Sequence, residues 1–427
     1  MKCSIKVIRP GACTTVQDLG RIGYQKFGIP VAGVMDEFAA SVANFLVGNE
    51  RNEAVLEITY LGPTLEFQED MLIGIAGANV SPKLNGVPVP VWESFTVKKG
   101  DVLSFGSVKG GVRAYIAFAG SIDVPLVNGS KSTLMKSKIG GFQGRMLQAG
   151  DELSICVRQG TCPQRLPAHF IPIYPHSNDI AVCLGPQDDY FTEQGISDFF
   201  GHPYTITANA DRMGIRLEGT AVAHKTKADI ISDAAVIGSI QVPADGKPII
   251  LMADRQTTGG YAKIGTIIKE DIIKLAQMAS NDTIQFRRIS MEEAQQKYRT
   301  FYQKLEEIRS SLQALCNTGI HACASGTAVN ASAGGHTGKD STVASVPDAA
   351  GNTAAAVKET VCLPVAGTVS KMAVKTGDTV KEGDLLFTFE AMKMENDMTA
   401  PCSGTVGRIY KKAGGLTDAG EPVLEIV

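Results

Sequence analysis

The sequence predicts a mainly β protein of several domains that also contains one long α-helix and one flexible linker. Three observations carry this prediction. The chain has 427 residues, well beyond the ~100–200 residues of a typical domain. Its first two thirds consist of short β-branched runs separated by glycine, proline and Asn-Gly turns, a spacing typical of sheets and barrels. Its last segment, residues 361–427, contains an internal repeat.

Composition and charge argue against several kinds of partner. The chain has 44% hydrophobic residues, 20% charged residues and a formal net charge of -3, so we expect neither nucleic acid nor a membrane as a partner. No apolar run approaches the ~18–20 residues of a membrane span, and residues 1–6 lack the apolar core of a secretory signal. The nine cysteines form no Cys-x-x-Cys pair, which predicts reduced thiols in a cytoplasmic protein and no metal site.

Two β domains of similar size are predicted before the helix, at residues 1–157 and 178–289. Runs such as 71–76 and 111–118 are rich in apolar and β-branched residues and end at glycine or alanine-glycine steps. The segment 158–177 contains four prolines spaced a few residues apart. Because proline ends regular structure, we interpret this segment as the connection between the two domains.

A long helix is predicted over residues 290–316. Ser290 and Glu293 have the spacing of a capping box, in which each side chain takes a free amide of the first turn. Apolar residues follow in alternating steps of four and three, the period of a packing seam: Ala294, Tyr298, Phe301, Leu305, Ile308, Leu312 and Leu315. The seam packs either on its own domain, which we favour, or on a helix of a partner.

Residues 317–360 are predicted to be a flexible linker. This stretch consists almost entirely of Ala, Gly, Ser, Thr, Asn and Val, and it has too little apolar surface to offset the entropy of ordering. Residues 334–340 resemble a phosphate-binding loop only faintly, because Asp340 stands where a Ser or Thr is needed.

The C-terminal segment repeats itself with an offset of 37 residues. The motif at 364–369 returns at 401–406, and Gly377 and Gly383 return as Gly414 and Gly420. Two equal β-rich halves predict a small quasi-symmetric β-sandwich, in which each half covers the apolar face of the other. If the halves pair, the segment between them must reverse direction, which places Lys393 near the tip of a tight hairpin.

The hairpin motif Ala391-Met392-Lys393-Met394 resembles the attachment site of the biotinyl domain of biotin-dependent carboxylases. Lipoyl domains, which share this sandwich, usually carry Asp where Met392 stands. The resemblance implies that biotin protein ligase attaches biotin covalently to Lys393, with Met392 and Met394 as the flanking residues of the cofactor site. The alternative is that Lys393 is an ordinary exposed turn lysine. The second turn, 414–417, departs from the first but leaves the hairpin motif intact.

Residues 3–290 carry a series of polar motifs bracketed by glycine, which include the segments 9–21, 33–36, 140–145, 185–191, 211–217, 238–243 and 251–261. In this order they resemble the KipA-like family, also described as allophanate hydrolase subunit 2 or as the C component of 5-oxoprolinase, whose module forms half of the carboxyltransferase domain of urea amidolyase. The resemblance implies a pair of cyclophilin-like β-barrel domains. The turn at 120–123 departs from the family pattern, because a second glycine is usual there.

A KipA-like module joined to a biotinyl domain resembles the carboxyltransferase and carrier parts of a urea-carboxylase-type enzyme. The resemblance implies transfer of CO2 from carboxybiotin on Lys393 to the nitrogen of a small amide or lactam, of the urea or 5-oxoproline type. The chain lacks both a recognisable phosphate loop and the KipI-like module, which corresponds to the B component of 5-oxoprolinase. We therefore expect a KipI-like subunit and a biotin carboxylase subunit, which uses ATP and bicarbonate, as partners, and no turnover without them.

Residue types suggest which side chains serve this chemistry. Arginines can polarise a carbonyl or hold a carboxylate, aspartates can accept an amide proton, and Gln or Thr can orient an amide. The candidate catalytic residues are Asp254, Gln241, Thr257, Arg212, Asp211 and Arg21, with Asp36, Arg216 and Gln256 as further candidates and Gly259-Gly260 as a point of close backbone approach. The alternative for each is that it braces a loop.

A non-enzymatic function is the competing hypothesis. KipA-like proteins are also linked to regulation through a KipI-like partner, and such a protein would act by binding alone. A regulatory protein has no use for a biotinylated lysine on a long tether, so the C-terminal domain favours the carboxyltransferase function.

Overall fold

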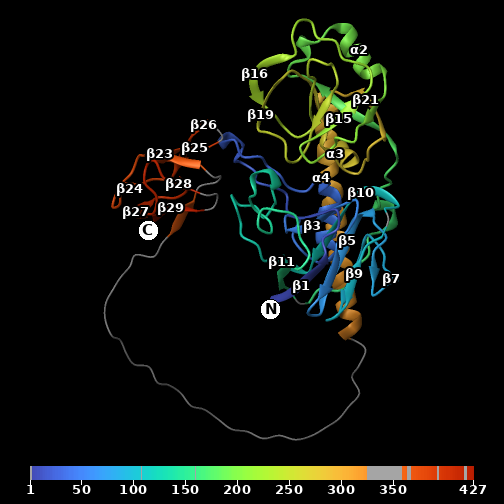
Figure 1. Cartoon of the computed structure of the whole chain (residues 1–427). Helices are drawn as coiled ribbons and strands as arrows, with labels where there is room; N and C mark the ends of the chain where they lie inside the picture. Colours follow the sequence, from blue (N-terminus) through green and yellow to red (C-terminus); the bar gives the residue numbers. More distant parts are fainter. Residues whose placement is uncertain are drawn as a thin grey trace, which may run out of the picture. The chain divides into compact units, whose positions relative to one another are not determined.

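The structure is a computed structural model that describes residues 2–106, 108–158, 160–324, 358–362, 367–391, 394–417 and 421–427. The chain divides into two compact units, Met1–Cys316 and Asn317–Val427. Within the first unit, two β-rich halves stand end to end along one long helix (Figure 1). Mainly β structure is thus confirmed.

The first half consists of two sheets that enclose an apolar core. One sheet has the order β11-β12-β1-β4-β9-β6-β7, with β1 Lys2–Arg9, β4 Thr64–Phe67, β6 Lys83–Leu84, β7 Val87–Pro88, β9 Val102–Ser104, β11 Gly120–Ile122 and β12 Glu152–Val157. The other has the order β2-β3-β10-β5-β8, with β2 Cys13–Gln17, β3 Val55–Thr59, β5 Met71–Asn79, β8 Glu93–Val97 and β10 Gly110–Phe118. Helix α1 (Glu37–Leu46) packs on β5 and β10, and short 3-10 turns lie at η1 (Gln25–Phe27) and η2 (Met135–Ser137).

The second half is a closed barrel with the strand order β13-β20-β17-β18-β15-β14-β21. Its strands are β13 Ser177–Leu184, β14 Tyr204–Ile206, β15 Gly214–Glu218, β17 Ser239–Gln241, β18 Ile249–Leu251, β20 Lys263–Ile267 and β21 Thr283–Arg288, with η4 (Asp188–Tyr190), α2 (Glu193–Gly201) and α3 (Lys269–Ala276) between them. A separate two-stranded ribbon, β16 (Asp229–Ala234) with β19 (Thr258–Tyr261), projects from the barrel (Figure 1).

Helix α4 (Met291–Ala324) begins where the capping box predicts. Ser290 Oγ accepts a hydrogen bond from the Glu293 amide at 3.2 Å, and Glu293 Oε2 accepts one from the Ser290 amide at 3.2 Å. The seam residues Phe301, Leu305, Ile308 and Leu312 are buried in a core that also contains α1. The seam therefore packs on its own unit, and the helix continues past its predicted end at residue 316.

The segment 158–177 also joins this core rather than lying free of it. Leu166 and Phe170, the latter in the short turn η3 (Ala168–Phe170), are buried against the same cluster as α1 and α4. The two β halves of the first unit are therefore joined by a packed connection.

The prediction that all nine cysteines are reduced thiols is wrong at Cys162, which is disulfide-bonded. Among the described residues, the free cysteines are Cys3, Cys13, Cys156, Cys183, Cys362 and Cys402. A disulfide requires two cysteines whose Cα atoms lie within ~4.4–6.8 Å and whose Cβ atoms point toward each other, and sequence spacing does not show which cysteines the fold places in this way. Among the described residues, no helix is both long and apolar enough to span a membrane, and no group of three or more candidate ligands is placed to hold a metal.

The C-terminal unit contains two four-stranded sheets, with the orders β22-β29-β27-β24 and β26-β25-β23-β28. Their strands are β22 Glu359–Cys362, β23 Gly367–Met372, β24 Thr379–Val380, β25 Leu385–Ala391, β26 Met394–Thr399, β27 Gly404–Ile409, β28 Leu416–Thr417 and β29 Pro422–Ile426. A shift of 37 residues carries each strand of one sheet onto a strand of the other, in the same order. The sequence repeat is thus a structural repeat. The predicted linker, 317–360, is wrong at both ends, because residues 317–324 continue α4 and residues 359–360 belong to β22; residues 325–357 lie outside the described part of the chain.

Candidate functional site

A cavity of about 330 Å³ opens where the two halves of the first unit meet. Its wall from the first half includes Met35 and Arg113, and its wall from the second half includes Arg212, Met213 and Asp254. The other lining residues are Cys13, Thr59, Tyr60, Val112, Met135, Lys136, Ala210, Asp211, Ile215, Leu275 and Met278. The cavity therefore combines mostly apolar walls with a few converging charged groups, the composition expected of a small-molecule site.

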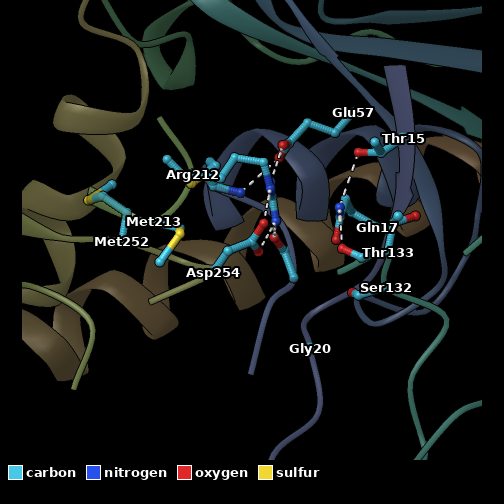
Figure 2. A network of polar contacts seen from close by, with 12 residues as sticks. Thr15, Gln17, Gly20, Glu57, Ser132, Thr133, Arg212, Met213, Met252 and Asp254 are labelled. Atoms are coloured by element: carbon cyan, nitrogen blue, oxygen red, sulfur yellow. Dashed lines mark hydrogen bonds and ion pairs between the residues drawn. The ribbon is translucent and has the colours of Figure 1, made fainter. Parts of the chain in front are cut away.

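Arg212 is the centre of the charged groups (Figure 2). It precedes β15, and its Nε and Nη2 donate to the two carboxylate oxygens of Asp254 at 3.0 and 2.8 Å. Its Nη1 donates to Glu57 Oε1 on β3, and its Nη2 also donates to the Gly33 carbonyl at 2.6 Å. One guanidinium thus binds two carboxylates, one from each half, in a fork geometry that lysine cannot provide.

All three members of this ion network are buried: Arg212 is 7%, Glu57 1% and Asp254 8% exposed. Burial alone would lower the pKa of the Arg212 guanidinium, but the charges of Asp254 and Glu57 outweigh burial and raise that pKa above its ordinary value. Arg212 is therefore fixed as a cation in the wall of the cavity, and removing it would leave two buried carboxylates without their counter-charge.

A second set of buried contacts joins the halves beside the first. Gln277, after α3, donates from Nε2 to Asp36 Oδ2 at 2.8 Å, and its Oε1 accepts from the Val112 and Arg113 amides at 2.9 and 3.0 Å. Asp36 also caps α1 by accepting from the Ala39 amide at 2.9 Å. Burial raises the pKa of Asp36 to about 6, although these hydrogen bonds oppose the shift.

Tyr115 on β10 links these two sets of contacts. Its hydroxyl donates to Glu57 Oε2 at 2.9 Å and accepts from the Asp36 amide at 2.8 Å. Glu57 Oε2 also accepts from the Met35 amide at 2.8 Å. Every oxygen of this buried carboxylate is therefore hydrogen-bonded, as a buried charge requires.

Arg21 is fully buried in the first half, 0% exposed, and does not line the cavity. Its Nη2 donates to the Ser132 carbonyl, whereas Nε and Nη1 have no hydrogen-bond partner among the described residues. Burial lowers the pKa of Arg21, and the charges of Asp18 and Asp254 partly oppose this. Gln17, in the same region, is held by Thr15 and by the Thr133 carbonyl at 3.1 Å each (Figure 2).

The remaining predicted residues fall into different places. Asp211 lines the cavity, but its Oδ1 accepts the amides of Met213 and Gly214 at 2.8 and 2.9 Å, which makes it the brace of a turn. Arg216 is exposed on β15.

Two other predicted residues lie near the β16–β19 ribbon, outside the cavity lining. Gln241 does not line the cavity, and its Oε1 accepts a hydrogen bond from Gln256 Nε2 at 3.3 Å beneath this ribbon. Thr257 also lies outside the cavity lining, and its carbonyl accepts from the Ala235 amide at 2.9 Å.

Lys393 and Met392 lie outside the described residues. The backbone on either side of them is described: β25 and β26 pair antiparallel, with Ala391 opposite Met394. Met392 and Lys393 are thus the two residues that connect a pair of adjacent strands. A short connection between paired strands fits the covalent attachment of biotin, which needs a lysine amine displayed apart from the sheet.

The sequence analysis did not identify Glu57, Tyr115 and Gln277 as residues of the junction, the buried hydrogen-bond network that joins the two halves of the first unit. A signal was present for Glu57, because it is a charged residue inside the apolar run 55–58 of a buried strand. Such a residue needs a buried partner of opposite charge. Tyr115 and Gln277 gave no comparable signal, since their partners are distant in the sequence.

Comparison with known proteins matches both units. Residues 27–288 match the family described as carboxyltransferase domain, subdomain A and B, and residues 359–426 match the family described as biotin-requiring enzyme. The chain is 38% identical to the C component of 5-oxoprolinase from Escherichia coli over 290 residues, 68% of this chain and 93% of that protein. It is 40% identical to the biotin carboxyl carrier protein of Streptococcus mutans over 72 residues, 17% of this chain and 55% of that one.

Among solved structures, that of urea amidolyase from K. lactis is similar, with a TM-score of 0.69 and 32% identity. The similarity covers 72% of this chain and 20% of that much longer one. The C-terminal match, with its similarity to a biotin carboxyl carrier protein, supports biotin as the covalent cofactor of the second unit. The chain belongs to the carboxyltransferase family built of subdomains A and B, and it joins this domain to a biotin carrier domain.

Proposed function

We propose that this chain moves a carboxyl group carried by biotin on Lys393 to the nitrogen of a small amide or lactam, of the urea or 5-oxoproline type. The observation that carries the proposal is that a carboxyltransferase domain and a biotin carrier domain occur in one chain. The relatives named for 5-oxoprolinase and urea amidolyase support an amide or lactam as the acceptor.

The cavity between the two halves is the proposed acceptor site. An amide nitrogen is a weak nucleophile, so the site must accept its proton and polarise its carbonyl. Asp254 faces the cavity and is held by both of its oxygens on Arg212, which leaves a second lone pair on each oxygen for a substrate N–H. We assign Asp254 as the acceptor of the amide proton and Arg212 as the residue that positions it.

Arg113 is the proposed partner of the substrate carbonyl or carboxylate. It lines the cavity, its Nη1 donates to the Ala276 carbonyl at 2.5 Å, and its Nε has no hydrogen-bond partner among the described residues. A buried donor without a partner is costly unless a ligand satisfies it. The apolar walls at Met35, Met213 and Met278 would exclude water, which strengthens these interactions. Asp211 is given no role in the proposed chemistry, because its Oδ1 already accepts two backbone amides.

The proposal also requires partners. A biotin protein ligase attaches the cofactor to Lys393. A biotin carboxylase then carboxylates the biotin, using bicarbonate as the carbon source and ATP as the energy source. A KipI-like protein completes the carboxyltransferase. The isolated chain is therefore expected to bear biotin and to turn over no amide.

The first experiment tests the attachment. The full chain is co-expressed with a biotin protein ligase, and its intact mass is measured. The wild type is expected to gain the mass of one biotinyl group, Lys393→Arg to gain none, and Lys371→Arg, an exposed lysine on β23 of the same domain, to behave as wild type. A wild type without label, or equal labelling of Lys393→Arg, would contradict the proposed attachment site.

The second experiment tests the acceptor site in the complex reconstituted with both partner proteins. ATP hydrolysis stimulated by a panel of amides identifies the substrate. Asp254→Asn is then expected to lower amide-dependent turnover by ~10²–10⁴-fold, the usual contribution of a general base, while biotinylation is unchanged. Turnover by the isolated chain, or an Asp254→Asn complex as active as wild type, would contradict the proposal.

A further inference from the structure

A second polar cluster lies in the barrel half, under the β16–β19 ribbon. It consists of Gln187, Asp233, Gln241 and Lys263, and none of these residues lines the cavity between the halves. Gln241 ends β17 and Lys263 begins β20, and the two are directly opposite each other in the sheet. Directly opposed residues of an antiparallel pair point to the same face. The cluster therefore has its own place in the fold, and the proposed reaction does not use it.

Lys263 is a buried ammonium group. The residue is 2% exposed, and within the described part of the chain its Nζ makes one hydrogen bond, to Asp233 Oδ2 at 2.8 Å. An ammonium carries three donors and no acceptor. A cation at this depth is stable only when it is paired, so Asp233 or a substitute for it must be present.

Gln241 supplies a second buried donor at the same place. The residue is 3% exposed, its Oε1 accepts from Gln256 at 3.3 Å, and its Nε2 has no hydrogen-bond partner among the described residues. A Cβ atom on Gly259 would lie 2.2 Å from this nitrogen, so the amide is directly against the ribbon strand β19. Buried donors without a partner are rare in native proteins and indicate a missing ligand or water.

Asp233 is the one exposed member of the cluster, with a side chain that is 47% exposed. It belongs to ribbon strand β16, whose residues are mostly exposed and which pairs only with β19. Its Oδ2 accepts from Lys263 and from Gln187 Nε2, the latter at 3.0 Å, and these hydrogen bonds lower the pKa of Asp233. A surface carboxylate thus reaches inward from the ribbon to the buried donors.

We propose that Lys263, Gln187 and Gln241 form a binding site for a small planar carboxylate, and that the Asp233 carboxylate occupies this site in the present structure. A ligand carboxylate that replaces Asp233 keeps the bonds from Lys263 and Gln187. It has a free oxygen for Gln241 Nε2, which Asp233 leaves unsatisfied. Both bicarbonate and an organic carboxylate have this chemistry, and the half-exposed Asp233 side chain is the group that either ligand must displace.

Calorimetric titration of the full chain with sodium acetate, at constant ionic strength, tests the proposal. Asp233→Ala removes the carboxylate that competes with the ligand for these donors. We therefore expect acetate to bind this variant at least ~10-fold more tightly than the wild type, because no side chain has to leave the site before acetate binds. Asp229→Ala removes the same charge from an exposed position of the same strand and is expected to bind as wild type does. Equal affinity of Asp233→Ala and wild type would overturn the proposal.

Two further variants, made in the Asp233→Ala background, identify the donors. Lys263→Met is expected to abolish acetate binding, and Gln241→Leu to weaken it ~10-fold, with melting temperature as the check on folding. If Lys263→Met does not fold, the Gln241→Leu result still decides, because unchanged affinity in that variant contradicts the site.

Titrations with bicarbonate and sulfate distinguish the ligands. Tighter binding of bicarbonate than of acetate would identify the inorganic anion, and the reverse an organic carboxylate. A sulfate affinity that rises as much as that of acetate on removal of Asp233 would show a general anion response and contradict a planar site. None of these titrations requires biotin or a partner protein, so the result is independent of the proposed carboxyl transfer.

Discussion

Arg212 in the barrel half forms a buried ion pair with Glu57 in the first half, although the two residues are 155 positions apart in the sequence. Since Arg212 also binds Asp254 in the cavity wall, one guanidinium both joins the two halves and shapes the candidate site. The stability of the junction and the geometry of the site are therefore coupled.

Replacing Arg212 with Met is expected to lower the free energy of unfolding by ~3–5 kcal/mol, because two buried carboxylates lose their counter-charge. The same substitution at Arg216, which is exposed four residues away, is the matched control and should change it by less than ~0.5 kcal/mol. Urea unfolding followed by the fluorescence of Trp92, the single tryptophan of the chain, measures both. Equal effects of the two substitutions would show that the network does not hold the halves together.

The pH dependence of stability follows from Asp36. Its folded-state pKa, about 6, is raised above the unfolded value, so the folded protein holds this proton more tightly. The associated stabilisation is present at low pH and is lost as pH rises through about 6. Between pH 4.5 and pH 7.5 the stability of wild type relative to Asp36→Asn should fall by ~2 kcal/mol, because each pKa unit corresponds to ~1.4 kcal/mol. A difference independent of pH, measured by urea unfolding, would be inconsistent with a buried carboxyl of raised pKa.

The sequence predicted those parts of the fold that local patterns determine. The capping box at Ser290, the seam at Leu305 and the 37-residue repeat each rest on residues close in the chain, and all three are present in the structure. The disulfide at Cys162 was not predictable, because it depends on contacts that only the folded chain creates.

The candidate site was predictable only in part, for the same reason. Arg212 and Asp254 were chosen from glycine-bracketed motifs, and both line the cavity. The same reasoning also selected Arg216, which strand alternation directs outward while Ile215 and Leu217 point into the core. Glu57 was missed because its partner arrives from the other half. Residue type alone therefore indicates chemistry, and tertiary pairing decides which candidates meet.

The packing of α4 predicts that substitutions on its buried face lower the free energy of unfolding far more than substitutions on its exposed face. Leu305 is 1% exposed and shares a core with Trp92, whereas Glu306 is exposed. Leu305→Ala is expected to destabilise the first unit by ~2–5 kcal/mol, since it removes buried methyl groups and leaves a cavity. Glu306→Ala should change stability by less than ~0.5 kcal/mol in the same fluorescence-detected unfolding. A small effect of Leu305→Ala would mean that the helix contributes little to the first unit.

The structural repeat of the carrier domain predicts that replacing either of two equivalent glycines with alanine lowers the stability of the domain by the same amount. Gly377 and Gly414 have φ of +93° and +84°, and each donates its amide to the other half of the repeat, to the Val406 and Val369 carbonyls at 2.7 Å. A Cβ at either position meets open space, so alanine costs backbone strain alone, ~1–2 kcal/mol. Asn, which tolerates positive φ better, should cost less at both. Amide hydrogen exchange of β23 and β27 measures the loss of stability in each half of the carrier domain. A large loss for one glycine substitution and none for the other would show that the two turns do not contribute equally to stability.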